Sequence, residues 1–237
     1  FWATTDEAIP VGSPPMDAAN VFLDSKRNPI DIGGYISVVQ TWCRFRNEAA
    51  LRKYPVTRYY NANGMAAYAG LISTLVDEIA TTNQVVGGAE PLRELSAQQV
   101  NDLNYARFVN FWSRTNGFVV SSGMTGAHNI NEYYRSDYVR LSTMRITQGA
   151  LQAVRIVAAP FIGKPNNAQN RSALENAIDK ALGKRVERGA LEDFGFTLTS
   201  TPTMRVLGQI LVDLTLVPAF EIVEIQVKTG LSTAVAA

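Results

Sequence analysis

The sequence predicts an α+β fold, with mixed helix-and-sheet lobes and a helix-and-sheet domain at the carboxy-terminal end. Three observations support this prediction. The chain has 237 residues, of which 46% are hydrophobic and 18% charged, so it can bury a core. Its first half holds short segments rich in β-branched and aromatic residues. Its last third holds a long pattern of helical period, followed by strand-like segments.

The first half is expected to begin with a loop or linker, residues 1–29, because prolines interrupt any regular element there. Residues 35–45 are rich in β-branched and aromatic side chains and predict a strand. A turn over residues 61–64 then leads into apolar positions at helical spacing over residues 65–79. This part of the chain therefore predicts one strand followed by one helix.

A second helix and a hairpin are expected next. Ser96 is a candidate N-cap, and Gln99 lies three residues after it, which is capping-box spacing and predicts a helix over residues 97–104. Residues 107–114 and 118–122 predict two strands. The Asn-Gly pair between these strands accepts positive φ at little energetic cost, so the two strands should form a hairpin.

The last third begins with residues 133–140, which are expected to be extended, and continues with a helix over residues 141–159. After a break that contains glycine and proline, apolar residues at helical spacing predict a long helix over residues 167–188. Gly189 is a suitable C-cap for it, because glycine adopts the left-handed conformation easily.

Three strands are then expected, over residues 194–199, 206–217 and 220–228. The apolar residues of the last one are Ile222, Val223, Ile225 and Val227, and polar residues alternate with some of them. Residues 230–237 are small and have no evident place in a core.

Composition excludes several classes of protein. The net charge is +1, with 22 basic and 21 acidic residues, which predicts no nucleic-acid partner and no acidic membrane partner. The single cysteine, Cys43, rules out an intrachain disulfide and a cysteine-rich metal site. No apolar segment reaches the roughly 20 residues that cross a bilayer, and no secretory signal is recognised.

Catalytic groups are sparse. His128 is the only histidine, and nothing in the sequence fixes its geometry relative to Ser121, Ser122 or Asp137. Cys43 lies in an aromatic segment and is expected to be a small buried hydrophobe. No phosphate-binding loop is present, and adjacent carboxylates, as at Asp77 and Glu78, are read as solvated surface. The sequence therefore predicts no catalytic residue, no metal site and no cofactor.

One charged feature is more specific. Lys180, Lys184 and Arg188 repeat at positions i, i+4 and i+8 of the long helix, with Arg185 nearby. Two readings stay open: a solvated helix edge whose cations favour the helix C-terminus, or a ridge that docks on an acidic partner. Gly183 in the same helix costs about 1 kcal/mol relative to alanine, which points to a close approach or a bend.

Five segments, taken in order, carry a family resemblance: residues 31–39, 68–72, 103–125, 138–142 and 165–222. They are, in turn, the Asp-Ile-Gly-Gly-Tyr segment, a Tyr-Ala-Gly-Leu-Ile helix start, a hairpin with a Gly-Met-Thr turn, a Tyr-Val-Arg-Leu-Ser segment, and the long helix with its strands. In this order and spacing, the chain resembles the carboxy-terminal portion of the contractile tail sheath proteins of bacteriophages and related contractile injection systems.

This resemblance implies a structural subunit that polymerises in stacked rings around an inner tail tube and contracts to drive the tube through a target envelope. It implies a homo-oligomer with tube, baseplate and tail-terminator proteins as partners, and no membrane insertion. The location implied is the phage tail, after assembly in the host bacterial cytoplasm. Residues 30–135 would be the central lobe of the sheath, and residues 136–237 its carboxy-terminal domain with a terminal arm.

The resemblance also implies two contact sites. A helix of the carboxy-terminal domain would face the tube, and the candidate contacts are Lys180, Lys184, Arg185 and Arg188. The last strand would add to a neighbour's sheet through Ile222, Val223, Ile225 and Val227, by main-chain hydrogen bonding. The domain's small sheet is therefore expected to be open to strand addition from neighbouring subunits. A matching amino-terminal arm is not recognised.

Two alternatives remain. A sheath-related baseplate or tail-terminator component would share the same features without forming a long cylinder. A soluble α/β enzyme with an unrecognised site would need a nucleophile and a base brought together by the fold.

Overall fold

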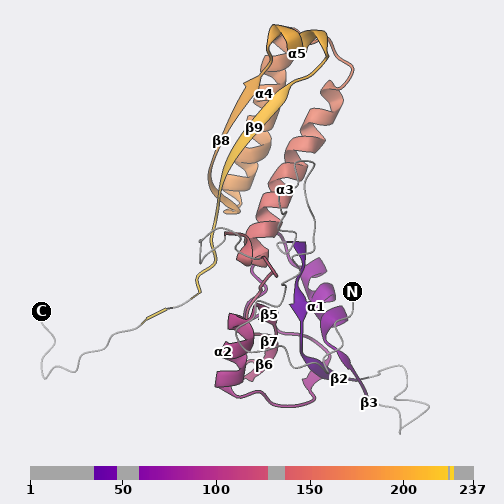
Figure 1. Ribbon diagram of the computed structural model, residues 1–237, viewed down its shortest axis with the longest axis vertical. Helices are drawn as coiled ribbons and strands as arrows, with labels where there is room; N and C mark the ends of the chain where they lie inside the picture. Colours follow the sequence, from indigo (N-terminus) through magenta and orange to yellow (C-terminus); the bar gives the residue numbers. More distant parts are fainter. Residues whose placement is uncertain (1–34, 47–58, 128–136, 224, 227–237) are drawn as a thin grey trace, which may run out of the picture.

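The computed structural model describes residues 35–46, 59–127, 137–223 and 225–226. These form two lobes, which lie end to end in Figure 1. The lower lobe contains β1 (Val38–Val39), β2 (Trp42–Arg46), β3 (Tyr59–Asn63), α1 (Met65–Thr74), β4 (Ala89–Pro91), α2 (Ala97–Tyr105), β5 (Phe108–Val109), β6 (Phe111–Arg114) and β7 (Gly117–Val120). The upper lobe contains α3 (Leu141–Ala158), α4 (Ala168–Glu187), β8 (Leu191–Thr199), α5 (Pro202–Val206) and β9 (Leu211–Pro218). Short 3-10 turns occur at Asp137–Val139 and Ala159–Phe161.

The lower lobe is built from small sheets around one core. β2 pairs with β3 and β4 in antiparallel fashion, β1 pairs with β5 in parallel, and β6 and β7 form a hairpin. Their buried side chains meet those of α1 in a cluster that includes Val39, Cys43, Tyr68, Val109, Phe111, Phe118 and Val120. Gly64 caps α1 at this core, and a Cβ there would lie 2.4 Å from the Phe111 ring. Only glycine therefore lets α1 begin this close to the core.

The upper lobe is a helical hairpin that covers one face of a β-ribbon. In Figure 1, α3 rises from the junction of the lobes, α4 returns, and β8 and β9 rise and return beside them with α5 at the tip. The ribbon alternates, so that one face carries Phe194, Phe196, Leu198, Val212, Leu214 and Leu216 towards the helices. α4 meets this face with Leu174, Ile178 and Leu182, spaced four residues apart.

The two cores adjoin within the first turns of α3. Leu141 packs against the core of the lower lobe, whereas Ile146 and Ala150 belong to the core of the upper lobe. α3 is therefore the element that both lobes share.

Several expected elements are confirmed. The long helix has Asn167 as its N-cap, whose Oδ1 accepts a hydrogen bond from the Asn170 amide at 2.8 Å. It ends at Glu187, and Gly189 has the positive φ of 74° that the C-cap prediction requires. The Ser96 capping box opens α2, and the Asn-Gly turn joins β6 to β7.

Other expectations in the lower lobe are wrong. The strand expected over 35–45 is interrupted at Thr41, whose carbonyl and hydroxyl oxygens accept hydrogen bonds from the Gly64 and Phe111 amides. The helix expected to reach residue 79 ends at Thr74. Strands β3 and β4 were not expected, because the Asn-Ala-Asn end of β3 and the Ala-Glu-Pro sequence of β4 carry little strand signal.

The end of the chain also differs from expectation. Val206 lies in the short helix α5, which Thr201 caps and Pro202 begins, so the strand starts later, at Leu211. The strand expected over 220–228 is absent from residues 220–223 and 225–226, which have no regular secondary structure. Residues 137–139 form a 3-10 turn where extended chain was expected. Val227, the linker 1–29 and residues 133–136 lie outside the described residues.

Candidate functional site

The long helix α4 separates its apolar and basic residues onto different sides. Leu174, Ile178 and Leu182 are buried against the ribbon, whereas Lys180, Lys184 and Arg188 are exposed. We call these three cations the basic stripe. They extend over the last two turns of the helix, where positive charge interacts favourably with the helix dipole. The structure thus brings these three predicted residues together on one accessible surface.

Arg185, the fourth predicted cation, points elsewhere. Its Nη1 lies 3.0 Å from Oδ2 of Asp77, and only 19% of its side chain is exposed. Arg185 therefore binds the lower lobe, and the basic stripe is made by the other three residues.

Gly183 lies between the cations of the basic stripe. A Cβ at this position would have no other atom within 4 Å, so the packing of this chain does not require glycine there. Glycine within a helix nevertheless costs about 1 kcal/mol relative to alanine. The helix continues through it from Ala168 to Glu187, so Gly183 does not end the helix.

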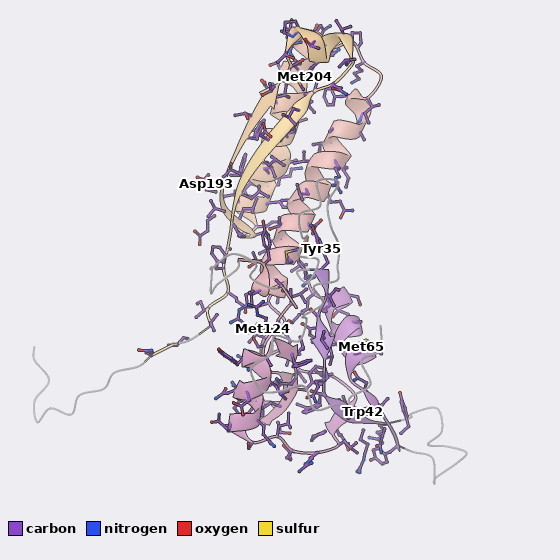
Figure 2. The ribbon with its side chains drawn as sticks, viewed as in Figure 1. Tyr35, Trp42, Met65, Met124, Asp193 and Met204 are labelled. Atoms are coloured by element: carbon purple, nitrogen blue, oxygen red, sulfur yellow. The ribbon has the colours of Figure 1, made fainter. Side chains whose placement is uncertain are left out.

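The ribbon β8–β9 offers two strand edges. Among the described residues each of its strands pairs only with the other, from Leu191↔Pro218 to Thr199↔Leu211. The side chains that face the helices, such as Phe194 and Leu214, are only half-buried. A further strand beside the ribbon would both satisfy an edge and cover this apolar surface. Figure 2 shows Asp193 along the ribbon and Met204 at the tip of the lobe.

The segment after β9 holds several exposed apolar side chains close together. Phe220, Ile222, Val223 and Ile225 are all exposed, and the exposed fraction of Ile222 is 80%. Glu221 differs from its neighbours, because its side chain is 9% exposed and pairs with Arg140 at 2.8 Å. Residues 222, 223 and 225 of the predicted strand are therefore exposed for contact with another molecule, and they follow the buried carboxylate of Glu221.

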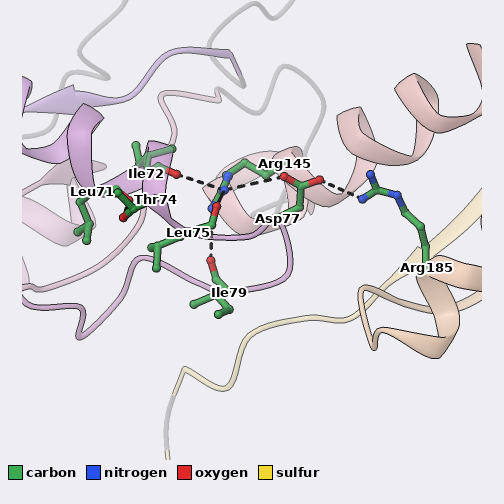
Figure 3. Close-up of polar contacts among 8 residues, drawn as sticks. All are labelled: Leu71, Ile72, Thr74, Leu75, Asp77, Ile79, Arg145 and Arg185. Atoms are coloured by element: carbon green, nitrogen blue, oxygen red, sulfur yellow. Dashed lines mark hydrogen bonds and ion pairs between the residues drawn. The ribbon is translucent and has the colours of Figure 1, made fainter. Parts of the chain in front are cut away.

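A polar cluster joins the two lobes (Figure 3). Asp77 follows α1. Its Oδ2 pairs with Arg185 of α4, and its Oδ1 lies 3.9 Å from Nη2 of Arg145 on α3. Arg145 also donates to the carbonyls of Ile72 at 3.3 Å, of Ile79 at 3.4 Å and of Leu75. We call Asp77, Arg145 and Arg185 the junction cluster.

Gly149 of α3 lies directly against the junction cluster. A Cβ there would lie 2.3 Å from Oδ2 of Asp77 and 2.6 Å from Nη1 of Arg185. The missing side chain therefore leaves the space in which the two charged groups meet.

Sequence reasoning missed these polar contacts. Asp77 is partly solvated, as expected, with 37% of its side chain exposed, but the arginines that face both of its oxygens were not expected. Arg140 and Glu221 carried no local signal either, since they lie 81 residues apart along the chain and meet only through the path that the chain takes after β9. Such pairs appear only when the fold brings distant segments together.

The described residues contain no recognisable catalytic arrangement. Cys43 is buried, and burial raises the pKa of its thiol from 9.0 to about 11. The hydroxyl of Ser121 donates to Asn104 at 2.9 Å, and that of Ser122 accepts from Arg140 at 2.7 Å. His128 lies outside the described residues.

The part of the chain that the structure describes holds no group of three histidine, cysteine or acidic residues placed to bind a metal ion. None of its helices combines the length and apolar character needed to cross a membrane.

Known proteins resemble this chain in structure and not in sequence. No protein-family model matches the chain, and no curated protein matches it. The helical sheath of the anti-feeding prophage, in its contracted state, matches with a TM-score of 0.66 and 15% identity, over 89% of this chain and 59% of that one.

Two further structures match in the same way. The sheath tail protein of Desulfitobacterium hafniense has a TM-score of 0.57 and 12% identity, over 78% of this chain and 46% of its own. A chain of the six-fold symmetrised baseplate of the anti-feeding prophage has a TM-score of 0.58 and 16% identity, over 72% and 51%. The chain thus spans about half the length of the proteins it resembles, and it has the fold of contractile sheath proteins over that part.

Proposed function

We propose that this chain is a structural subunit of a contractile sheath, which polymerises around an inner tube and contracts to drive the tube through a target envelope. The observation that carries the proposal is the match to a contractile sheath over 89% of this chain. In this role the protein forms stacked rings in a helical array and needs no cofactor. It acts in a phage tail or a related injection machine, assembled in the bacterial cytoplasm.

Neighbouring subunits would be linked by strand addition. The exposed residues Ile222, Val223 and Ile225 form the donated segment, and a free edge of the ribbon β8–β9 receives it. Main-chain hydrogen bonds supply affinity in such contacts, and alternate side chains supply specificity. Within the described part of the chain, Ile222, Val223 and Ile225 belong to no strand, so they are available for donation.

The inner tube would be contacted by the basic stripe of α4. Lys180, Lys184 and Arg188 are exposed and carry like charge along one helix, which fits an acidic surface on the tube. Gly183 would allow the tube to approach the helix backbone closely.

Electron microscopy of the purified full-length protein tests the proposal as a whole. Hollow cylinders or rings are the expected result, with or without the tube protein. A monodisperse monomer that hydrolyses a substrate would instead support an enzyme and overturn the proposal.

The tube contact has its own test, in which Lys180, Lys184 and Arg188 are each changed to glutamate. Each reversal should lower the yield of sheath on tubes, while sheath formed without tubes stays unchanged. Arg155→Glu is the matched control, since Arg155 is an exposed cation on α3 of the same lobe. Normal yield on tubes after all three reversals would rule out docking by the basic stripe.

The match to a baseplate chain favours one second candidate, a sheath-related component of the baseplate. Such a protein would form a single ring at one end of the tube. Counting copies per particle separates the two candidates, since a sheath repeats along the tube and a baseplate component does not.

A further inference from the structure

We propose that the ion pair between Glu221 and Arg140 is the anchor of the donated carboxy-terminal segment, so that the segment pivots at residue 221. The inference rests on the proposed strand addition and deepens it. Glu221 and Arg140 are positioning residues in this account, since they are proposed to act on the neighbouring subunit only through the segment they hold.

The anchor is a built and largely buried site. Nη1 of Arg140 lies 2.8 Å from Oε1 of Glu221, and the exposed fractions of the two side chains are 22% and 9%. The Ser142 hydroxyl donates to Oε2 of Glu221 at 3.3 Å, and Arg140 donates to the Ser122 hydroxyl at 2.7 Å. Both partners of the ion pair therefore have a serine as a second neighbour.

The charge of Glu221 depends on Arg140. Among the described residues, its buried Oε1 accepts no hydrogen bond and is compensated by the Arg140 guanidinium alone. A buried charge that loses its partner is strongly unfavourable. Burial raises the pKa of the nearby Tyr68 phenol, the hydrogen bond between Tyr68 and Thr81 lowers it, and the negative charge of Glu221 raises it further.

The anchor ties the end of the chain to a different lobe from the ribbon it leaves. The last ribbon-side contact is the hydrogen bond from the Ala219 amide to the Ala190 carbonyl, at 3.1 Å. Two residues later, Glu221 binds Arg140, which directly precedes α3, beside Ser122 of the lower lobe. The segment therefore crosses the junction of the lobes and is held there (Figure 1).

Glu221 is a single buried side chain within an exposed segment. The exposed fraction is 55% for Phe220, 9% for the Glu221 side chain and 80% for Ile222. A segment that is fixed at Glu221 samples a smaller volume than a segment that is free from the end of the ribbon onwards. Its effective concentration at the neighbour's acceptor edge is therefore higher. A pulling force on the donated strand would also be transmitted through the ion pair to Arg140 and α3, and would not separate β9 from β8.

Glu221→Gln is the primary test, because it keeps the shape of the side chain and removes its charge. Hydrogen–deuterium exchange of the monomer reports the anchor, and electron microscopy of the full-length protein reports assembly. Glu90→Gln is the matched control, since Glu90 is an exposed carboxylate on β4 of the lower lobe, away from the ribbon. Melting temperatures identify any variant that loses its fold.

The double variant Glu221→Arg with Arg140→Glu separates an anchor from a simple loss of packing. The serine hydroxyls can donate or accept, so Ser122 and Ser142 can serve the exchanged pair. The exchanged pair should restore whatever the single substitutions lose.

In Glu221→Gln, amides 219–223 should exchange at least about tenfold faster, since a charged hydrogen-bonded contact contributes more than 1.4 kcal/mol. The melting temperature should fall by about 3–6 °C, and cylinders should form less readily. The control should match wild type and the exchanged pair should recover.

Unchanged exchange, or faster exchange with normal assembly, overturns the anchor. If wild type forms no rings or cylinders, the proposed function fails, while the exchange result still decides whether the anchor exists.

Discussion

Cys43 illustrates how burial sets the chemistry of a single residue. Its side chain is fully buried between strands and α1, and burial raises the pKa of the thiol from 9.0 to about 11. The nucleophilic thiolate is therefore scarce at neutral pH. We predict that at pH 8 the folded protein reacts with a thiol reagent at least about 100-fold more slowly than the urea-unfolded protein, given the two-unit shift.

The same shift gives Cys43 a pH-dependent effect on stability. The unfolded thiol loses its proton near pH 9.0, before the folded one does at about pH 11. Its contribution to the free energy of unfolding is therefore complete below pH 9 and is lost as the pH rises to 11. Urea titrations of wild type and Cys43→Ser between pH 8 and 10.5 should show a steeper loss for wild type. Parallel curves, or rapid labelling of the folded protein at pH 8, would contradict this account.

Two helical glycines should respond oppositely to the same substitution. Gly183→Ala should stabilise the monomer by up to about 1 kcal/mol, because the new Cβ meets no atom and alanine favours helix. Gly149→Ala should destabilise it, because its Cβ would collide with Asp77 and Arg185. Urea unfolding measures both. If Gly183→Ala stabilises the monomer but weakens sheath assembly on tubes, a close approach of the tube at this position is supported. If Gly183→Ala destabilises the monomer, the result contradicts the open space around Gly183.

At the level of elements, the junction cluster fixes α3 and α4 against the end of α1. Asp77→Asn should lower the free energy of unfolding by about 1 kcal/mol, since Asp77 is partly exposed and water screens the pair. In a double-mutant cycle with Arg185→Gln, the two effects should be less than additive. Glu78→Gln, at the next position along the chain, should change stability by less than about 0.5 kcal/mol. Full additivity would show that Asp77 and Arg185 do not act together.

The elements that sequence could predict are those with local signals. α4 was predicted within one residue at each end, because its apolar period lies within the helix and the stop signal at Gly189 lies directly after it. The basic stripe followed from that same period. The strand break at Thr41 and the path of Glu221 could not be predicted, because Phe111 and Arg140 decide them from 70 and 81 residues away. The candidate surface on α4 could thus be predicted from the local sequence, whereas the ion pair between Glu221 and Arg140 depends on tertiary contacts and could not.

At the scale of the whole molecule, the surfaces proposed to pair are different from each other. The donated segment around Ile222 and the free edges of β8–β9 lie on separate parts of one chain. A contact between two different patches is heterologous, and it propagates into a ring or an open helix instead of stopping at a dimer. One kind of strand contact is therefore sufficient for an extended array, and monomers without the segment should remain single.

A chain that stops after Glu221 tests this argument. It keeps the ion pair with Arg140, so its monomer should fold with a melting temperature close to that of the full chain. It lacks Ile222, Val223 and Ile225, so it should form neither rings nor cylinders. Light scattering and electron microscopy measure assembly, and circular dichroism measures the fold.

A peptide that spans residues 220–228 provides the complementary test, because it carries the donated segment without the subunit. Added to the full-length protein, it should compete for the free edge of the ribbon and inhibit assembly in proportion to its concentration. A control peptide with Ile222→Asp and Ile225→Asp should inhibit much less, since charged side chains would oppose the half-buried apolar face. Normal assembly of the truncated chain, or equal inhibition by both peptides, would show that the ribbon does not receive this segment, and the array would then depend on contacts made by the rest of the subunit.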